Sequence, residues 1–286
     1  MRRDAVKTSL LGFVAAAGAV LVGVSSALAQ ETIGAPVEWQ WGFQEAQSPI
    51  MERIYSFYDW ALFPMMIVIS AFVLALMAYI LFRFKRSSNP EASTNTHNTT
   101  LEVVWTVVPI LILVGIAIPS LRLLYYEETI PEADITIKAV GYQWSWYYEY
   151  PDHGGIEVDG SYVPEDQLEP GQLRLLTTAE AVVLPVGQVI RVQLTSEDVI
   201  HAWALPAAGA KMDAVPGRLN EFWIELNTEG MYYGQCSELC GQLHGFMPIM
   251  VEAVSPEEFE AWVNEQQVAQ GKVPADKVEL AANDQN

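Results

Sequence analysis

Two long apolar stretches constrain the fold of this 286-residue chain more than any other feature of its sequence. Residues 60–82 carry no charged side chain, and residues 103–124 carry only Arg122. As a helix, each stretch is long enough to cross a hydrocarbon core of roughly 30 Å. The sequence therefore predicts two transmembrane helices, 60–82 and 103–124, that form a hairpin.

The linker between these stretches, residues 83–102, sets the orientation of the hairpin. It is short and polar, and it opens with a basic cluster that ends at Arg86. Basic side chains accumulate in cytoplasmic loops, so we expect the linker in the cytoplasm and both flanks of the hairpin outside it. The second helix is expected to open with a capping box, in which Thr99 is the cap and Glu102 reaches back to it.

The N-terminal region predicts the same orientation. Residues 1–29 combine three basic side chains, a short apolar run and a final Ala-Leu-Ala. This pattern is typical of a removable secretory signal peptide, with an uncleaved first membrane helix as the alternative. Residues 30–59 would then be a periplasmic segment with an interfacial helix, because Ser48 followed by Pro49 is a strong helix start.

The sequence changes character after the second apolar stretch, and residues 125–254 predict a β domain. Apolar and polar residues alternate at 135–140, 189–194 and 222–226, and Gly- and Pro-containing turns separate such runs. Several short strands spaced in this way indicate a sandwich or barrel. A helix at 255–271, with a serine cap and an acidic first turn, and an acidic tail at 272–286 complete a membrane-anchored all-β chain.

The charge of the chain is concentrated in its second half. Residues 125–286 contain 27 acidic and 7 basic side chains, so they account for the whole net charge of −20. A field of this sign steers a basic soluble partner and argues against binding nucleic acid. Acidic residues that are candidates for the rim of a docking face are Glu149, Asp152, Glu157, Asp159 and Asp198.

Both cysteines of the chain lie in residues 236–247, CSELCGQLHGFM, which we call the copper loop. Cys236, Cys240, His244 and Met247 have the spacing C-x3-C-x3-H-x2-M. Thiolate, imidazole and thioether groups suit copper, and a mononuclear blue-copper site would use only one of the two cysteines. Two thiolates can instead bridge two copper ions. A disulfide is the alternative in an exported chain.

A second imidazole has to come from outside the copper loop. His201 follows the strand-like run 189–194, so it would lie at a strand end from which it can face the loop. His97 lies in the predicted cytoplasmic linker and His153 in a turn, so neither is well placed. We therefore expect His201 to be the second histidine of the site.

The most aromatic stretch of the chain is residues 141–150, GYQWSWYYEY. By strand alternation, Tyr142, Trp144 and Trp146 are expected to share one face. Packing within a sheet is the ordinary explanation for such a run.

The copper loop, DVIHAW at 198–203 and the aromatic stretch together resemble subunit II of the cytochrome c oxidases, in the haem–copper oxidase family. The resemblance implies a cupredoxin-like Greek-key β-barrel with a binuclear copper A centre. In that centre Cys236 and Cys240 would bridge two copper ions, and His201 and His244 would be the terminal ligands.

The resemblance also implies roles for four further residues. Met247 would be one axial copper ligand and the backbone carbonyl of Glu238 the other, while the Glu238 side chain would bind a magnesium ion shared with subunit I. Trp144 would receive electrons from the docked donor. Glu102, at the cytoplasmic start of the second helix, would admit protons to the K-type channel of subunit I.

As a whole, the resemblance implies the electron-transfer subunit of a bacterial aa3-type oxidase. It would accept electrons from cytochrome c on its acidic face and pass them to subunit I, which reduces dioxygen and pumps protons. Expected partners are cytochrome c, subunits I and III and the lipid bilayer. The location would be the bacterial inner membrane, with the copper domain in the periplasm.

Three other protein classes share parts of this pattern. A quinol oxidase subunit is a metal-free relative, but this chain has the complete ligand set. A membrane-tethered copper chaperone or thiol–disulfide protein would not need His244, Met247 and a second span. Nitrous oxide reductase shares the copper loop but needs a longer chain and more than the four histidines present.

Overall fold

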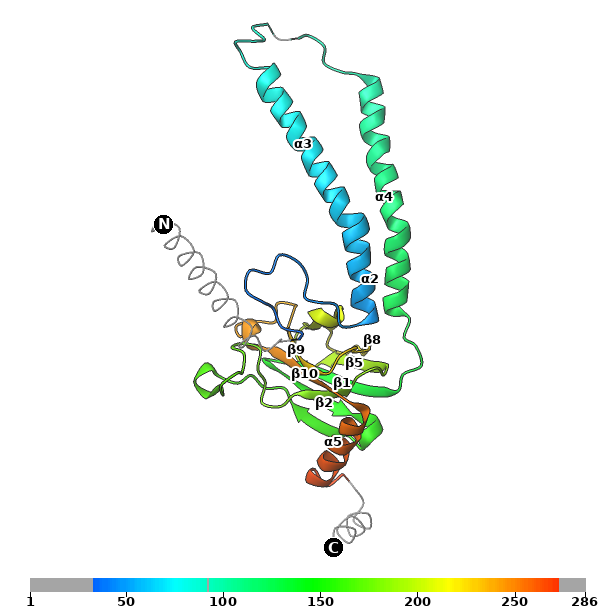
Figure 1. The fold of residues 1–286 in the computed structure, drawn as a ribbon, viewed down its shortest axis with the longest axis vertical. Coiled ribbons are helices and arrows are strands. Elements are labelled where there is room, and N and C mark those ends of the chain that lie inside the picture. The colour runs from blue at the N-terminus through cyan, green and yellow to red at the C-terminus, as the bar shows by residue number, and fades with distance from the viewer. Residues whose placement is uncertain (1–32, 92, 273–286) are drawn as a thin grey trace, which may run out of the picture. The chain divides into compact units, whose positions relative to one another are not determined.

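The computed structural model describes residues 33–91 and 93–272. The predicted signal peptide, residues 1–29, and the predicted tail beyond residue 272 lie outside these described residues. Within them the chain forms a helical hairpin, a β domain and a C-terminal helix (Figure 1). This architecture confirms the fold class predicted from the sequence.

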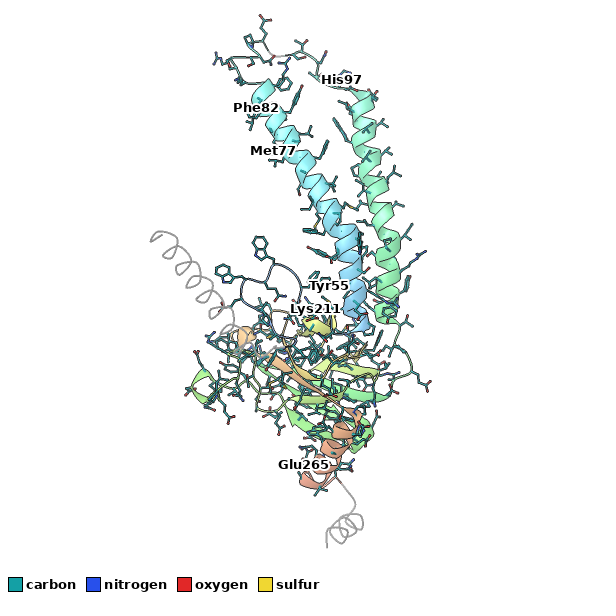
Figure 2. All side chains as sticks on the ribbon, viewed as in Figure 1. Tyr55, Met77, Phe82, His97, Lys211 and Glu265 are labelled. Carbon is teal, nitrogen blue, oxygen red and sulfur yellow. The ribbon has the colours of Figure 1, made fainter. Side chains whose placement is uncertain are left out.

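Two long helices form the hairpin. The first runs without a break through α2 (Pro49–Phe57), a π-helix (Tyr58–Leu62) and α3 (Phe63–Arg83), and the second is α4 (Thr99–Glu128). Both are long and apolar enough to cross a membrane, and both extend past the predicted apolar stretches at both ends. Their apolar side chains are exposed, as on α3 in Figure 2, so they require a lipid environment.

The starts of the two helices have different caps. Ser48 caps α2, because its hydroxyl accepts a hydrogen bond from the Met51 amide, which confirms the predicted start. The predicted capping box of the second helix is wrong. Asn98, not Thr99, is the cap: its side chain accepts from the Leu101 amide at 3.2 Å. Both asparagine and threonine cap helices well, so neighbouring polar residues made the position ambiguous.

The start of α2 and the end of α4 contact the β domain. The Ser48 hydroxyl donates to the Ala208 carbonyl at 2.6 Å. On the other helix, the ring of Tyr126 packs edge-on against Trp223, with their centroids 5.5 Å apart. The guanidinium of Arg53 lies 3.5 Å from the centroid of the same Tyr126 ring.

Three sheets make up the β domain. The largest has the strand order β3-β2-β1-β5-β8, the second β4-β10-β9, and the third pairs β6 with β7. Neighbouring strands are antiparallel except for β1 with β5 and β4 with β10. The strands are β1 (Ile135–Tyr142), β2 (Ser145–Tyr150), β3 (Ile156–Asp159), β4 (Val182–Pro185), β5 (Ile190–Ser196), β6 (His201–Leu205), β7 (Ala210–Ala214), β8 (Asn220–Ile224), β9 (Gly230–Gln235) and β10 (Pro248–Val254).

Aromatic side chains dominate the core of the β domain. Trp146, Tyr148 and Tyr150 of β2 are fully buried, as is Trp203 of β6. Three of these four rings have partners for their polar atoms: Trp203 Nε1 donates to the Tyr148 hydroxyl at 3.2 Å, and the Tyr150 hydroxyl donates to a β4 carbonyl. Trp146 Nε1 has no hydrogen-bond partner among the described residues. The C-terminal helix α5 (Pro256–Ala269) adds Phe259 and Val263 to this core. It opens with the predicted capping box.

The aromatic stretch is not a single strand, so the expectation that Tyr142 and Trp146 share a face is wrong. The chain turns at Gln143 and Trp144, between β1 and β2. In the resulting hairpin Gly141 pairs with Trp146 and Tyr142 with Ser145. Trp146 therefore points into the core, and Tyr142 lies on the opposite face, beside Tyr147.

Candidate metal centre

The copper loop connects two strands that pair with each other, β9 and β10. A hydrogen bond from the Cys236 amide to the Met247 carbonyl, 3.0 Å long, closes the loop at its base. A second bond, from the Ser237 amide to the Ala202 carbonyl, attaches it to β6. Because β6 begins at His201, this attachment brings a histidine from outside the loop to the cysteines.

Five of the predicted ligand groups meet in one place. The two cysteine Sγ atoms are 3.8 Å apart. His201 Nδ1 lies 3.9 Å from Cys236 Sγ, and His244 Nδ1 lies 3.5 Å from Cys240 Sγ. The Met247 sulfur is 4.0 Å from Cys240 Sγ. His201 and the two cysteines also satisfy the distance criterion for a shared metal, with their ligand atoms within 4.8 Å of one another.

The sixth predicted ligand is a backbone group. The Glu238 carbonyl oxygen accepts a hydrogen bond from the Cys236 thiol at 3.3 Å, so it faces the same cluster. The Glu238 side chain is exposed. Because it is exposed, the carboxylate is accessible to a neighbouring molecule.

The site is largely shielded from water. His201 is fully buried, and Cys236, Cys240 and Met247 are buried, while His244 is half-buried. Both cysteines are free thiols, so the disulfide alternative does not describe this structure. A dry cluster of soft donors is the environment in which a copper ion is held by the protein rather than by solvent.

The two thiols differ in acidity. Burial raises the pKa of Cys236, but hydrogen bonds with His201 and with nearby backbone groups outweigh it and lower this pKa to about 6. Burial and the charge of Cys236 together raise the pKa of Cys240 to about 12. Metal ligands must be deprotonated, so a cation at this site takes the place of the Cys240 proton.

His201 is held in place from its far side by Asp198. Asp198 Oδ1 lies 2.9 Å from His201 Nε2, so Nδ1 of the same ring is directed at the cysteines. Burial lowers the pKa of His201, but the contacts to Cys236 and Asp198 outweigh it and raise this pKa. A carboxylate behind a ligating histidine fixes both the orientation and the tautomer of the ring.

The turn between β1 and β2 lies over the copper loop. Gln143 Nε2 and Trp144 Nε1 both donate to the Cys240 carbonyl, at 2.8 and 3.3 Å. The Gln143 amide also donates to Asp198 Oδ2 at 2.7 Å. Gly241 makes this approach possible, because a Cβ there would lie 2.9 Å from Gln143 Nε2 and its φ of +124° disfavours other residues.

The remaining residues considered as site candidates lie elsewhere or have a packing role. Trp146 is buried, and the centroid of its ring lies 5.8 Å from that of His201, so it supports the His201 ring from inside the core. His97 lies in the linker before α4 (Figure 2), and His153 packs edge-on against Phe259 of α5. Glu102 lies in the first turn of α4 and is half-buried.

The sequence analysis did not predict the contacts that Asp198 and Gln143 make at the site. Asp198 was considered only as part of a docking rim, although an acid three residues before a ligating histidine is a usable signal. Gln143 gave no signal, because its partner Cys240 lies 97 residues away in the sequence.

The sequence matches two family descriptions that together cover most of the chain. One is the transmembrane domain of cytochrome c oxidase subunit II, over residues 36–123, and the other is the periplasmic domain of the same subunit, over residues 135–254. The chain belongs to the cytochrome c oxidase subunit II family. It is thus a membrane-anchored oxidase subunit with a cupredoxin-like periplasmic domain.

Individual members of the subunit II family agree with this assignment. A probable cytochrome c oxidase subunit 2 of Rickettsia bellii is 47% identical over 251 residues, which are 88% of this chain and 89% of the relative. The Arabidopsis thaliana cytochrome c oxidase subunit 2 is 46% identical over 238 residues, 81% of this chain and 91% of the relative.

Among solved structures, the periplasmic domain of subunit II of cytochrome oxidase from Bradyrhizobium japonicum is 52% identical to this chain. The comparison covers 49% of this chain and 99% of that domain, with a TM-score of 0.46.

Proposed function

We propose that this chain carries the binuclear copper A centre of its oxidase and transfers electrons from cytochrome c to subunit I. The observation that supports this most directly is the pairing of donors. Each of two cysteine sulfurs, 3.8 Å apart, has an imidazole nitrogen of its own within 4 Å. One metal ion would leave part of this set unused, whereas two bridged ions use all of it.

The weaker donors fit the same arrangement. The Met247 sulfur lies on the side of Cys240, and the Glu238 carbonyl lies on the side of Cys236. Each of two metal ions held there would thus have one imidazole and one weak ligand, beside the two thiolates. Two copper ions held there would supply one-electron redox chemistry shared over both metals.

The protein residues keep the donor set rigid, and this is what fast electron transfer needs. Asp198 holds His201 from behind, and two side chains of the β1–β2 turn hold the Cys240 carbonyl. Ligands that cannot move do not have to rearrange when the charge of the site changes. Burial of the thiols keeps water from replacing them.

Trp144 is the proposed point at which electrons arrive. Its indole donates to the Cys240 carbonyl and remains half-buried, so the ring connects the copper loop with the protein surface. The acidic charge of the domain supports a basic partner such as cytochrome c, which would dock near this ring.

The other roles that we propose connect this chain to its partner subunits and to the membrane. The exposed Glu238 carboxylate would bind magnesium at the border with subunit I, and Glu102 would admit protons to the channel of subunit I. The hairpin would contact lipid and subunits I and III. The relatives from Rickettsia support a bacterial inner membrane as the location.

Electron paramagnetic resonance of the copper-loaded full chain in detergent tests the proposal. The expected spectrum shows hyperfine splitting from one unpaired electron shared equally by two copper nuclei, with two coppers per chain by elemental analysis. Splitting from a single copper nucleus would reduce the site to a mononuclear centre. Absence of bound copper would contradict the electron-transfer role.

A further inference from the structure

A cavity of about 400 Å³ lies between the two helices of the hairpin. Arg53 and Ser56 of α2, Trp60 of the π-helix and Arg122 of α4 contribute its polar side chains. The rest of its lining is apolar. It therefore combines two guanidinium groups with a surface suited to hydrocarbon.

Neither arginine is neutralised by the chain itself. Within residues 33–91 and 93–272, no carboxylate lies within ion-pair distance of Arg53 or Arg122. Arg53 has only the face of Tyr126, at 3.5 Å. An arginine at the end of an apolar span is stabilised by the membrane surface and by a paired anion, so an anion from outside the chain would stabilise Arg122.

The cavity lies at the depth of lipid headgroups. The basic cluster at residues 83–86 marks the cytoplasmic end of α3, so Trp60 lies at the opposite, outer end of the span. Trp60 is 85% exposed, as expected of an indole in a membrane interface. Arg53, seven residues before it, lies about 10 Å farther out along the helix, in the headgroup layer.

The local backbone helps to open the cavity. Trp60 and Ala61 belong to the π-helix, whose wider turn displaces these side chains from the positions of a regular α-helix. Short π-helical segments occur often at functional sites. On α4 the cavity is lined by Pro119, a residue that weakens helix packing and leaves space beside it.

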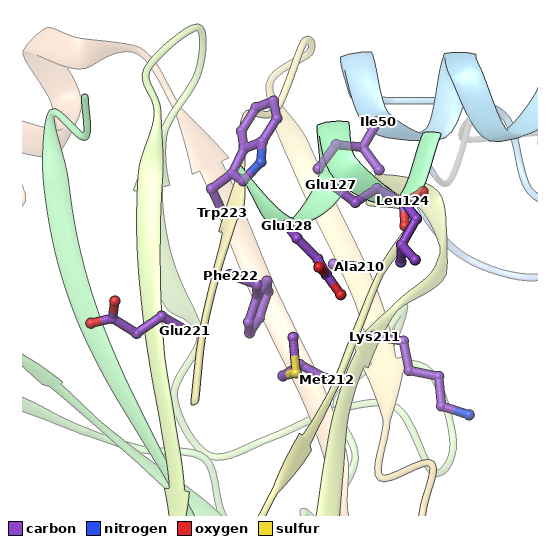
Figure 3. Close-up of a pocket in the computed structure, with 11 residues that line it drawn as sticks. Ile50, Leu124, Glu127, Glu128, Ala210, Lys211, Met212, Glu221, Phe222 and Trp223 are labelled. Atoms are coloured by element: carbon purple, nitrogen blue, oxygen red, sulfur yellow. The ribbon is translucent and has the colours of Figure 1, made fainter. Parts of the chain in front are cut away.

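The charge of this cavity contrasts with that of its neighbour. A second cavity, of about 190 Å³, lies where α4 meets β7 and β8 (Figure 3). Three carboxylates line it, those of Glu127, Glu128 and Glu221, with one lysine, Lys211. An anion is repelled from this acidic cavity and attracted by the two arginines.

We propose that the arginine-lined cavity binds the phosphodiester group of an anionic phospholipid from the outer leaflet. Guanidinium groups bind phosphate oxygens through paired, charge-assisted hydrogen bonds, and basic pockets between transmembrane helices are typical headgroup sites. The Ser56 hydroxyl adds a hydrogen-bond donor. The apolar lining and the Trp60 ring receive the start of the acyl chains.

Native mass spectrometry of the full chain in detergent tests this proposal. The delipidated protein is titrated with phosphatidylglycerol, or with phosphatidylcholine of the same acyl chains, and the bound lipids are counted. We expect one saturable phosphatidylglycerol site per chain. The double substitution R53Q/R122Q should weaken that site about fivefold for each arginine, or about 25-fold together.

A matched control removes two arginines at the other end of α3. The double substitution R83Q/R86Q takes away the same charge but should leave the saturable site unchanged, because neither residue lines the cavity. Circular dichroism of both variants checks that the helices remain folded. Retention of the lipid by R53Q/R122Q, or equal loss in both variants, would overturn the proposal.

Two further measurements identify the source of the phosphate. Displacement of the lipid by millimolar inorganic phosphate would mean a site for a soluble anion and would overturn the lipid assignment. In the assembled oxidase, the parent complex should retain the same lipid, and the R53Q/R122Q complex should lose it. If the variant instead loses subunit I while the lipid stays, the arginines are subunit contacts.

Discussion

Asp198 offers the sharpest perturbation of the metal centre that leaves all the ligands in place. Its carboxylate accepts three hydrogen bonds shorter than 3 Å, from His201 Nε2 at 2.9 Å, the Gln143 amide at 2.7 Å and the Val199 amide at 2.6 Å, besides a longer one of 3.4 Å from the Ser196 hydroxyl. It therefore fixes both a ligand and the turn above the copper loop. The substitution Asp198→Ala removes all of these bonds.

The expected size of the effect follows from these contacts. Hydrogen bonds to a charged group contribute about 1.5–3 kcal/mol each. The Asp198 side chain is 32% exposed, so water that enters the site in the variant offsets part of the lost hydrogen-bond energy. Loss of the group that orients a ligating histidine typically lowers metal affinity about 10- to 100-fold. We expect Asp198→Ala to weaken copper binding within that range, which corresponds to about 1.4–2.7 kcal/mol.

Asp198→Asn separates the two functions of the carboxylate. Its single oxygen can still accept from His201 and Val199, while its amide nitrogen faces the Gln143 N–H, which is also a donor. Copper affinity should therefore fall less than in the alanine variant. The turn that carries Trp144 should loosen, which predicts slower electron uptake from cytochrome c at nearly normal copper content.

Competition with a chelator of known affinity, performed on the full chain, measures copper binding in each variant. Asp152→Ala is the control, since this carboxylate also accepts from a backbone amide, that of Thr136 at 2.7 Å, but lies away from the copper loop. If the copper affinity of Asp198→Ala stays within twofold of the parent chain, Asp198 does not position His201 and the reasoning is refuted.

Three further substitutions have expected outcomes. Gly234→Ala would place a Cβ 1.9 Å from the Ala204 carbonyl, so thermal unfolding should show a loss of about 3 kcal/mol or more. Ser255→Ala removes the cap of α5 and should cost about 1 kcal/mol, whereas Ser87→Ala in the linker should cost nothing measurable by the same assay. Met247→Leu conserves buried volume, so stability should change by less than about 1.5 kcal/mol, while the optical spectrum of the copper-loaded chain should shift.

Local patterns in the sequence were sufficient to predict the two long helices and the residues that meet at the candidate metal centre. Hydropathy located both helices, and soft donors at close spacing identified the copper loop. The partner histidine was predicted because His201 follows a strand-like run, and the structure places it at the first residue of β6, facing the cysteines. These predictions needed only local chemistry and the general geometry of helices and strands.

The prediction for the aromatic stretch failed because it depended on how the chain turns. Alternation placed Tyr142 and Trp146 on one face, but the turn at Gln143 and Trp144 reverses the chain between them. Nothing in the sequence marks this turn, since neither glycine nor proline occupies it. Two further features likewise depend on tertiary structure. They are the hydrogen bond from Gln143 to the Cys240 carbonyl and the position of two arginines in one cavity between the helices.

The two parallel strand pairs of the domain join segments that are far apart in the sequence. β1 aligns with β5 through Ile135 and Ile190, and β4 aligns with β10 through Val182 and Val251, so both pairings join distant parts of the chain. Such pairings form slowly, because the intervening segments must first be ordered. β10 begins directly after Met247, so the copper loop cannot close until nearly the whole domain has crossed the membrane. A metal ion at the proposed centre would therefore be inserted late in biogenesis, after β10 has been synthesised.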